Sequence, residues 1–202
     1  MLILASRSLT RKTLLEGAGL PFAVDVAAID ERAVESAAVD AGADARQVAV
    51  LLAEAKATEV SARRPADLVI GADQTLALGP ELLHKPGSPE AAIVQLDRLA
   101  GKTHRLHAGI ALATNGRPVW SLVDTAELTM RAFTADERDA VLELEGDSVL
   151  NSVGGYRLEG PSIRLFEAVR GDYFTILGLP LLPLLEALRE QMPELFVGSA
   201  AR

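Results

Sequence analysis

The stretch Leu2–Gly17, with the sequence LILASRSLTRKTLLEG, decides the predicted fold class. Its apolar start, Leu2–Ala5, predicts a short buried strand. Ser8–Gly17 then predicts a helix, because Leu14 and Leu15 take the inward-facing positions. The order of strand, serine-rich turn and helix is typical of the opening unit of an α/β protein.

The rest of the chain continues to alternate apolar runs with helical patterns. Leu68–Ile70 predicts a buried strand that breaks at Gly71–Gln74 and resumes at Thr75–Leu78. Asn115-Gly116 is typical of a hairpin turn. The patterns predict further strands over 22–28, 103–113, 119–130 and 163–169, and helices over 46–62, 89–99, 135–144 and 181–191.

The sequence contains no internal repeat and no linker that would separate independent domains. We therefore expect a single domain over residues 1–192, followed by a C-terminal tail, 193–202. Hydrophobic residues make up 49% of the 202 residues and charged residues 24%, so the chain has ample material for a core and disorder is not expected.

The chain is acidic, with 20 Lys and Arg against 28 Asp and Glu and a net charge of -8. A surface of this charge repels polymeric nucleic acid and anionic membranes. An anionic ligand would therefore need a local cluster of basic side chains.

The absence of cysteine excludes disulfides, thiolate nucleophiles and cysteine-based metal sites. The N-terminus lacks the basic region of a signal peptide. The nearest approach to a membrane span, residues 176–188, is interrupted by Gly178, Pro180 and Pro183. A cytoplasmic location fits these features.

Serines and basic residues gather at the predicted strand-to-helix junction of residues 5–12. Backbone N–H groups and the helix dipole favour an anion there, and Arg11 can add a bidentate contact to phosphate. Ser6 and Ser8 supply hydroxyls. The alternative is that Ser8 only caps the helix while the basic side chains face solvent. The segment alone leaves both interpretations open.

Asp73 is a second candidate, because ligands of α/β sheets often lie beyond the carboxyl ends of strands. A carboxylate there can hold a metal ion or orient water, although a turn aspartate that bonds its own backbone is equally common. Lys85 follows a predicted hairpin and would project over the sheet edge, where a lone lysine is ordinarily solvated.

Glu31 and Glu159 are further carboxylates of the kind that bind Mg²⁺ or Mn²⁺, although each alone is typical of surface charge. The histidines do not predict a metal site. His104 and His107 would point to opposite faces of one strand.

In this combination the segments resemble the Maf family of nucleotide pyrophosphatases, from Leu4 to about Leu188. The resemblance lies in several blocks that follow the family's order. They are Leu4-Ala5-Ser6-x-Ser8 with Arg11, Leu14 and Leu15; Asp30-Glu31; Ala55-Lys56-Ala57; Gly71-Ala72-Asp73; Lys85-Pro86; Leu99-x-Gly101-Lys102-Thr103-His104; Gly154-Gly155-Tyr156-x-Leu158-Glu159-Gly160; and Gly178-Leu179-Pro180-Leu181.

The resemblance implies an elongated, mixed α/β sheet flanked by helices, with two lobes around a central nucleotide-binding cleft, as in Maf and inosine triphosphatase-like proteins. It also implies hydrolysis of nucleoside triphosphates, modified ones included, to monophosphate and diphosphate. Asp73 would be the general base, and Glu31 and Asp73 would bind a divalent cation, Mg²⁺ or Mn²⁺. The residues implied around the substrate are Ser6, Arg11, Lys56, Gln74, Lys85 and Glu159.

Asp73-Gln74 and Glu159-Gly160 resemble the family branch that acts on 7-methyl-GTP more than the branch that acts on dTTP and UTP. Thr10 stands where the family often has the first of two arginines, so one phosphate contact is either lost or supplied by Arg7 or Lys12. Asn151-Ser152 replaces the usual Asp-Lys, which puts the choice of substrate in doubt.

Two rival functions remain from the sequence. One is a nucleotide-binding regulator of cell division and septum formation without significant turnover, a role also associated with the family. The other is a phosphatase that releases the terminal phosphate. The resemblance also makes a homodimer plausible.

Overall fold

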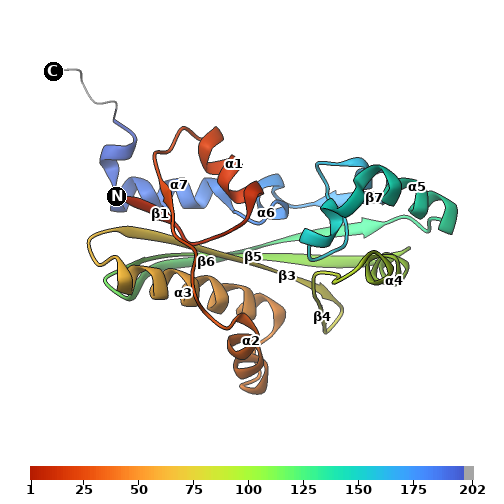
Figure 1. Ribbon diagram of the computed structural model, residues 1–202, viewed down its shortest axis with the longest axis horizontal. Helices are drawn as coiled ribbons and strands as arrows, with labels where there is room; N and C mark the ends of the chain where they lie inside the picture. The colour runs from red at the N-terminus through yellow and green to blue at the C-terminus, as the bar shows by residue number, and fades with distance from the viewer. Residues whose placement is uncertain (198–202) are drawn as a thin grey trace.

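The computed structural model describes residues 1–197 and contains one mixed, seven-stranded sheet with helices packed on both of its faces (Figure 1). The predicted α/β class is therefore confirmed. The strand order is β2-β1-β3-β5-β6-β7, and β4 pairs with β3. The strands are β1 (Leu2–Leu4), β2 (Ala23–Val24), β3 (Leu68–Leu78), β4 (Glu81–Leu83), β5 (Thr103–Thr114), β6 (Arg117–Met130) and β7 (Phe166–Arg170).

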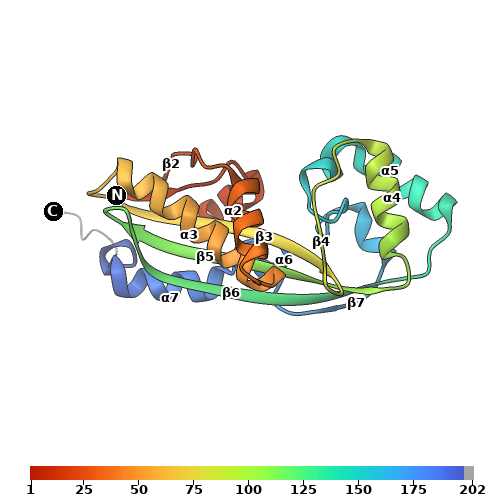
Figure 2. The same ribbon diagram turned by 90° about the horizontal axis from the view of Figure 1, so that it is seen from below.

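The helices form two groups joined by the long strands (Figure 2). The first group is α1 (Leu9–Gly17), α2 (Glu31–Asp40), α3 (Ala45–Arg63), α6 (Tyr173–Ile176) and α7 (Leu181–Gln191). The second is α4 (Pro89–Leu99) and α5 (Ala135–Glu145), together with the 3-10 turns η1 (Gly146–Asn151) and η2 (Pro161–Leu165). A third turn, η3 (Pro193–Leu195), follows α7. These groups are the two lobes expected from the resemblance.

Strands β3, β5 and β6 run through both lobes and connect them. The β5–β6 hairpin turns at Asn115 and Gly116, both with positive φ, as the Asn-Gly pair predicts. In the first lobe α1 and α7 cover one face of the sheet and α3 covers the other (Figure 1). The second lobe has its own apolar core, which includes Leu76, Leu96 and Leu128.

Helix α3 lies unusually close to the sheet because two strands present glycine beneath it. A Cβ atom on Gly71 would lie 2.1 Å from the carbonyl oxygen of Ala53, and one on Gly109 would lie 2.3 Å from that of Ala49. Any side chain at either position would push the helix away. This close approach lets side chains from the middle of α3 reach the surface of β3.

Strand β3 has an interruption in pairing along one edge. Its other edge pairs with β5 from Val69 to Ala77 without a break. On the interrupted edge, β1 pairs with Leu68–Ile70 and β4 pairs with Leu76–Leu78. Between them Gly71–Thr75 pairs with neither strand, and we call this segment the β3 gap.

The predicted break in this strand is wrong. Gly71–Gln74 lies inside continuous β3, because the glycine serves the approach of α3 and not a turn. The strand predicted over 22–28 contracts to Ala23–Val24, since the short β1 offers only two partner residues, Ile3 and Leu4.

Two helices were not expected from the sequence. Helix α2 shows no clear apolar periodicity in the sequence, because Ala38 is its only buried residue. Asp30 caps the helix by accepting a hydrogen bond from Ala33 N. Helix α6 is a short helix capped by Asp172. The strand predicted over 163–169 begins later, at Phe166, because Pro161 starts the turn η2.

Residues 193–197 of the predicted tail return to the first lobe, where Leu195 and Phe196 pack against its core. The rest of the predicted tail, 198–202, lies outside the described residues. Within residues 1–197, no helix has the length and apolar character needed to cross a membrane.

Candidate active site

Three charged side chains predicted from the sequence come together at the β3 gap. Asp73 lies on the face of β3 that carries α3, as do Gly71 and Thr75 two residues away on either side. Lys56 projects from α3 and donates a hydrogen bond of 2.6 Å from Nζ to Asp73 Oδ1. Glu31 Oε1 lies 3.0 Å from the same nitrogen. The buried ammonium is therefore neutralised by two carboxylates.

Glu31 is held in place by the chain that precedes it. Arg63, near the end of α3, donates to the carboxylate of Asp25 and to the carbonyl oxygen of Val26. Glu59, one turn earlier, accepts from Ala28 N. These bonds tie residues 25–28 to α3 and so direct the first turn of α2, with Glu31, towards Lys56.

Arg11 is almost fully buried and connects three segments. Its Nε donates to Gly178 O and its Nη1 to Ala72 O, both at 2.8 Å, and Nη1 also reaches Ser6 Oγ at 3.3 Å. Burial lowers the pKa of Arg11, while the nearby charges of Asp73 and Glu31 oppose that shift.

The bidentate phosphate contact expected of Arg11 does not fit this arrangement. Two of its three guanidinium nitrogens already donate to backbone carbonyls, so Nη2 remains as the one without a hydrogen bond to the described residues. Arg11 therefore holds the loop at Gly178 against the edge of β3, and it also places a positive charge near Asp73 and Glu31.

Ser8 caps α1, since its Oγ accepts from Arg11 N, and Ser6 Oγ accepts from Ser8 N. Ser8 is thus a helix cap, but Arg11 is buried and does not face solvent as the capping interpretation expected. Capping satisfies only one of the N–H groups that a first helical turn leaves without an intrahelical acceptor. A phosphate contact at this junction stays a prediction.

Gln74 points to the opposite face of β3 from Asp73. Its Nε2 donates to the carbonyl oxygens of Thr175 and Ile176, both at 3.0 Å. Thr175 in turn donates from Oγ1 to Asp124 Oδ2 at 2.6 Å. Asp124 was not among the residues predicted from the sequence, although an aspartate within the strand β6 is a signal of a functional or structural role. Both hydrogen bonds that Gln74 Nε2 donates therefore hold α6 in place.

Lys85 follows β4, on the second lobe. Burial lowers its pKa first, and the positive charge of Arg11 lowers it further, while Asp73 and Glu31 oppose the shift. Its side chain nevertheless remains exposed to solvent. The charges around Asp73 therefore affect the pKa of Lys85, although Lys85 forms no hydrogen bond or ion pair with them among the described residues.

Glu159 belongs to a separate ion-pair network of the second lobe. Its Oε1 lies 3.5 Å from Arg157 Nε, and Arg157 also approaches the buried carboxylate of Glu145 at 3.6 Å. Glu145 accepts hydrogen bonds from both the backbone and the hydroxyl of Ser162. Among the described residues, Glu159 forms no ion pair with Lys56 or Lys85.

The histidines have structural partners. His104 is buried and shares a hydrogen bond of 2.7 Å with Tyr156, and His107 bonds Thr125. Residues 1–197 bring no three His, Cys, Asp or Glu side chains together as a metal site. Glu31 and Asp73, however, each place a carboxylate oxygen beside the ammonium group of Lys56. Carboxylate oxygens are hard ligands that suit Mg²⁺ or Mn²⁺ when phosphate oxygens and water complete the coordination.

The family model described as "Maf-like protein" matches residues 1–191 of this chain. The chain belongs to the Maf-like family. A 7-methyl-GTP pyrophosphatase of Brucella abortus biovar 1 (strain 9-941) is 50% identical over 190 residues, which cover 94% of this chain and 96% of the relative. A protein of the same name from Rhizobium etli is 52% identical over 189 residues, covering 94% and 95%. A nucleoside triphosphate pyrophosphatase of Rhodopseudomonas palustris (strain BisB18) is 48% identical, covering 94% and 93%.

The blocks that resemble the Maf family meet in space although they are far apart in sequence. A Cβ atom on Gly155 would contact Pro86 Cγ at 3.6 Å, so the Gly154-Gly155-Tyr156 block packs beside the Lys85-Pro86 block. The ring of Tyr156 lies over Gly154 and extends to His104 in the core. Gly154 therefore leaves room for the ring of Tyr156, whereas Gly155 adopts a left-handed backbone conformation, with φ of 68°, that favours glycine.

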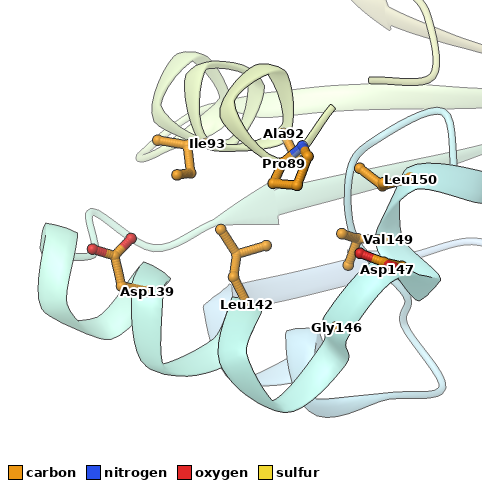
Figure 3. Close-up of a pocket in the computed structure, with 9 residues that line it drawn as sticks. All are labelled: Pro89, Ala92, Ile93, Asp139, Leu142, Gly146, Asp147, Val149 and Leu150. Carbon is orange, nitrogen blue, oxygen red and sulfur yellow. The ribbon is translucent and has the colours of Figure 1, made fainter. Parts of the chain in front are cut away.

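A cavity of about 300 Å³ lies elsewhere in this Maf-like chain, between α4, α5 and η1 (Figure 3). Its lining is mostly apolar and includes Ile93, Leu142 and Val149. None of the predicted site residues lines it. The cavity is therefore distinct from the cluster at Asp73.

Proposed function

We propose that this chain is a nucleoside triphosphate pyrophosphatase that cleaves its substrate to a nucleoside monophosphate and diphosphate. The observation that carries the proposal is the cluster of Asp73, Lys56 and Glu31 at the β3 gap, in a chain of the Maf-like family. A carboxylate with a lysine ammonium beside it, at the open edge of a strand, suits water activation next to an anionic substrate.

In the proposed reaction Asp73 accepts a proton from the water that attacks the α-phosphorus. The new bond joins the water oxygen to that phosphorus, the bond to the bridging α,β-oxygen breaks, and diphosphate leaves with the electron pair. Lys56, Lys85 and the remaining Nη2 of Arg11 offset the negative charge of the phosphates. The same charges explain how an acidic protein binds a polyanion.

We further propose that Glu31 and Asp73 hold a divalent cation, Mg²⁺ or Mn²⁺, together with the phosphates. When bound, that ion supplies Lewis-acid neutralisation of phosphate charge. Asp73 and Glu31 contribute oxygen ligands, and their convergence on Lys56 Nζ supports this assignment. Ser6 lies near enough to Arg11 to complete the phosphate-binding junction.

As the preferred base we propose 7-methylguanine. Several relatives at about 50% identity carry the name 7-methyl-GTP pyrophosphatase, and the pair Asp73-Gln74 supports the same branch. Because the side-chain amide of Gln74 donates its hydrogen bonds to α6, Gln74 would influence recognition of the base indirectly, by setting the position of α6. Glu159 remains the proposed contact from the second lobe.

The rival function, a nucleotide-binding regulator without turnover, requires no carboxylate at the position of Asp73. The retention of Asp73 beside Lys56 favours chemistry. A cytoplasmic location and a homodimer also remain proposals. Light scattering on the purified chain would measure its oligomeric state.

The deciding experiment is a product assay with Mg²⁺ or Mn²⁺ and 7-methyl-GTP, GTP, UTP, dTTP and CTP. We expect monophosphate and diphosphate in equal amounts, with 7-methyl-GTP cleaved fastest. Orthophosphate as the first product would identify a terminal phosphatase. Tight binding without any product would support the regulator.

A further inference from the structure

Lys56 occupies a position with the character of a cation site. Its Nζ lies 2.6 Å from Asp73 Oδ1 and 3.0 Å from Glu31 Oε1, and its side chain is only 9% exposed. Two carboxylates that point at one place repel each other unless a positive charge lies between them. In this structure the ammonium of Lys56 is that charge.

The two carboxylates differ in how firmly they are held. Asp73 belongs to a central strand that pairs with β5 across Gly109, and its side chain is 14% exposed. Glu31 stands on the first turn of α2 with a side chain that is 57% exposed. The pair is therefore closed on the side of the sheet and accessible on the side of Glu31.

The same two oxygens are the ligands assigned above to a divalent cation. An ammonium and a divalent ion cannot both lie between them, because the two positive charges would be only a few ångströms apart and would repel each other. We infer that Lys56 holds the position between Asp73 and Glu31 in the free protein, and that it must leave Asp73 before a divalent cation can bind there. The inference rests on the proposed function for the assignment of the cation.

The geometry also limits how Lys56 can leave. Helix α3 cannot shift towards or away from the sheet without losing its close packing on Gly71 and Gly109. The displacement must therefore come from rotation of the flexible four-carbon side chain. An ammonium released in this way remains beside the β3 gap, where the phosphates of the substrate would give it new partners.

Binding of the cation and of the nucleotide then become coupled. The cation alone must displace Lys56 into a position without a counter-charge, whereas the cation with a triphosphate gives Lys56 an anionic partner. Lys56 would thus suppress binding of the bare ion and favour the ion that arrives with the nucleotide. If Lys56 instead stays on Asp73 throughout, its removal weakens or leaves unchanged the binding of the bare ion.

The experiment measures binding of Mn²⁺ alone, without nucleotide and without turnover, by the electron paramagnetic resonance of the free ion. We expect Lys56→Met to bind Mn²⁺ at least ~10-fold more tightly than the wild-type protein, because the competing charge is gone. The double variant Lys56→Met with Asp73→Asn should lose that gain. Lys102→Met, at an exposed turn remote from the cluster, should behave as the wild type. Equal or weaker Mn²⁺ binding in Lys56→Met overturns the inference.

Two further variants keep the test decisive. If Lys56→Met does not fold, Lys56→Gln provides the same comparison with a polar side chain, and Lys56→Arg, which keeps the charge, should show no gain. The product assay on the wild-type protein is independent of these titrations. Product formation without a gain in Mn²⁺ binding would overturn the inference and leave the proposed function standing, while a gain without any product would do the reverse.

Discussion

Asp73 lies in the middle of a strand, and its chemistry comes from the neighbours that the fold gives it. Lys56 Nζ at 2.6 Å keeps its carboxylate in one orientation towards the β3 gap. We expect Asp73→Asn to fold and to lose turnover by a factor on the order of 10² to 10⁴, because an amide cannot accept the proton from water. Initial rates of diphosphate release measure this, with Asp40→Asn, on the exposed end of α2, as the control. Near wild-type turnover would remove Asp73 from the mechanism.

A second prediction for a single residue concerns His104. Burial lowers its pKa to about 4, whereas in an unfolded chain it is about 6.5. Between these pH values the unfolded chain binds a proton that the folded chain does not, so stability falls as the pH falls through this range. The loss attributable to His104 approaches about 3 kcal/mol near pH 4.

Urea unfolding at pH 7 and pH 4.5 tests the role of His104. His104→Gln, which does not titrate, should show a smaller loss of stability between the two pH values than the wild type. His84→Gln, at an exposed position, should keep the wild-type loss. An identical loss in all three proteins would exclude His104 as a source of the acid sensitivity.

At the scale of elements, α3 depends on two positions without side chains. We expect Gly109→Ala to lower the free energy of unfolding by at least about 1 kcal/mol, since its Cβ would lie 2.3 Å from the carbonyl oxygen of Ala49. It should also lower turnover, because a shifted α3 moves Lys56 relative to Asp73. Denaturant unfolding and initial rates measure both effects. Gly87→Ala, where a Cβ meets nothing within 4 Å, is the matched control. Unchanged stability in Gly109→Ala would contradict the close packing.

The elements also show which parts of the fold the sequence reveals. Local signals sufficed for the hairpin at Asn115-Gly116 and for the helix cap Ser8, because each depends on residues within one turn. The Gly71 signal was misread, since a glycine needed for contact with a distant helix looks the same in sequence as a glycine needed for a turn.

The site residues were predictable only as a set of candidates. The resemblance to a family predicted Glu31, Lys56 and Asp73 as site residues, but their spacing along the chain does not show that they lie together in the fold. Convergence depends on where β1 ends and on how closely α3 packs. Asp124 was missed because its partner, Thr175, lies on a short helix that sequence periodicity does not detect.

At the scale of the whole molecule, the proposed substrate contacts come from both lobes. Arg11 belongs to the first lobe and fastens Gly178 and Ala72, so Arg11→Ala should lower both stability, by about 2–5 kcal/mol, and kcat/KM. Lys85 belongs to the second lobe and is exposed to solvent. Lys85→Ala should change stability by less than about 0.5 kcal/mol and lower kcat/KM by a factor on the order of 10².

Thermal unfolding and steady-state kinetics on the two variants separate these roles. If Lys85→Ala retains the wild-type kcat/KM, the triphosphate does not extend to the second lobe. If Arg11→Ala is as stable as the wild type, the bonds to the two carbonyl oxygens do not contribute to the fold.

The β3 gap has a consequence for association between copies of the chain. An unpaired strand edge normally invites another strand to add to the sheet, which is a common beginning of aggregation. Here β1 and β4 close both ends of the edge, and Arg11 already occupies the carbonyl oxygen of Ala72. An incoming strand would also have to bury the charges of Lys56, Asp73 and Glu31. The edge can thus stay accessible to a small anion while it rejects another polypeptide.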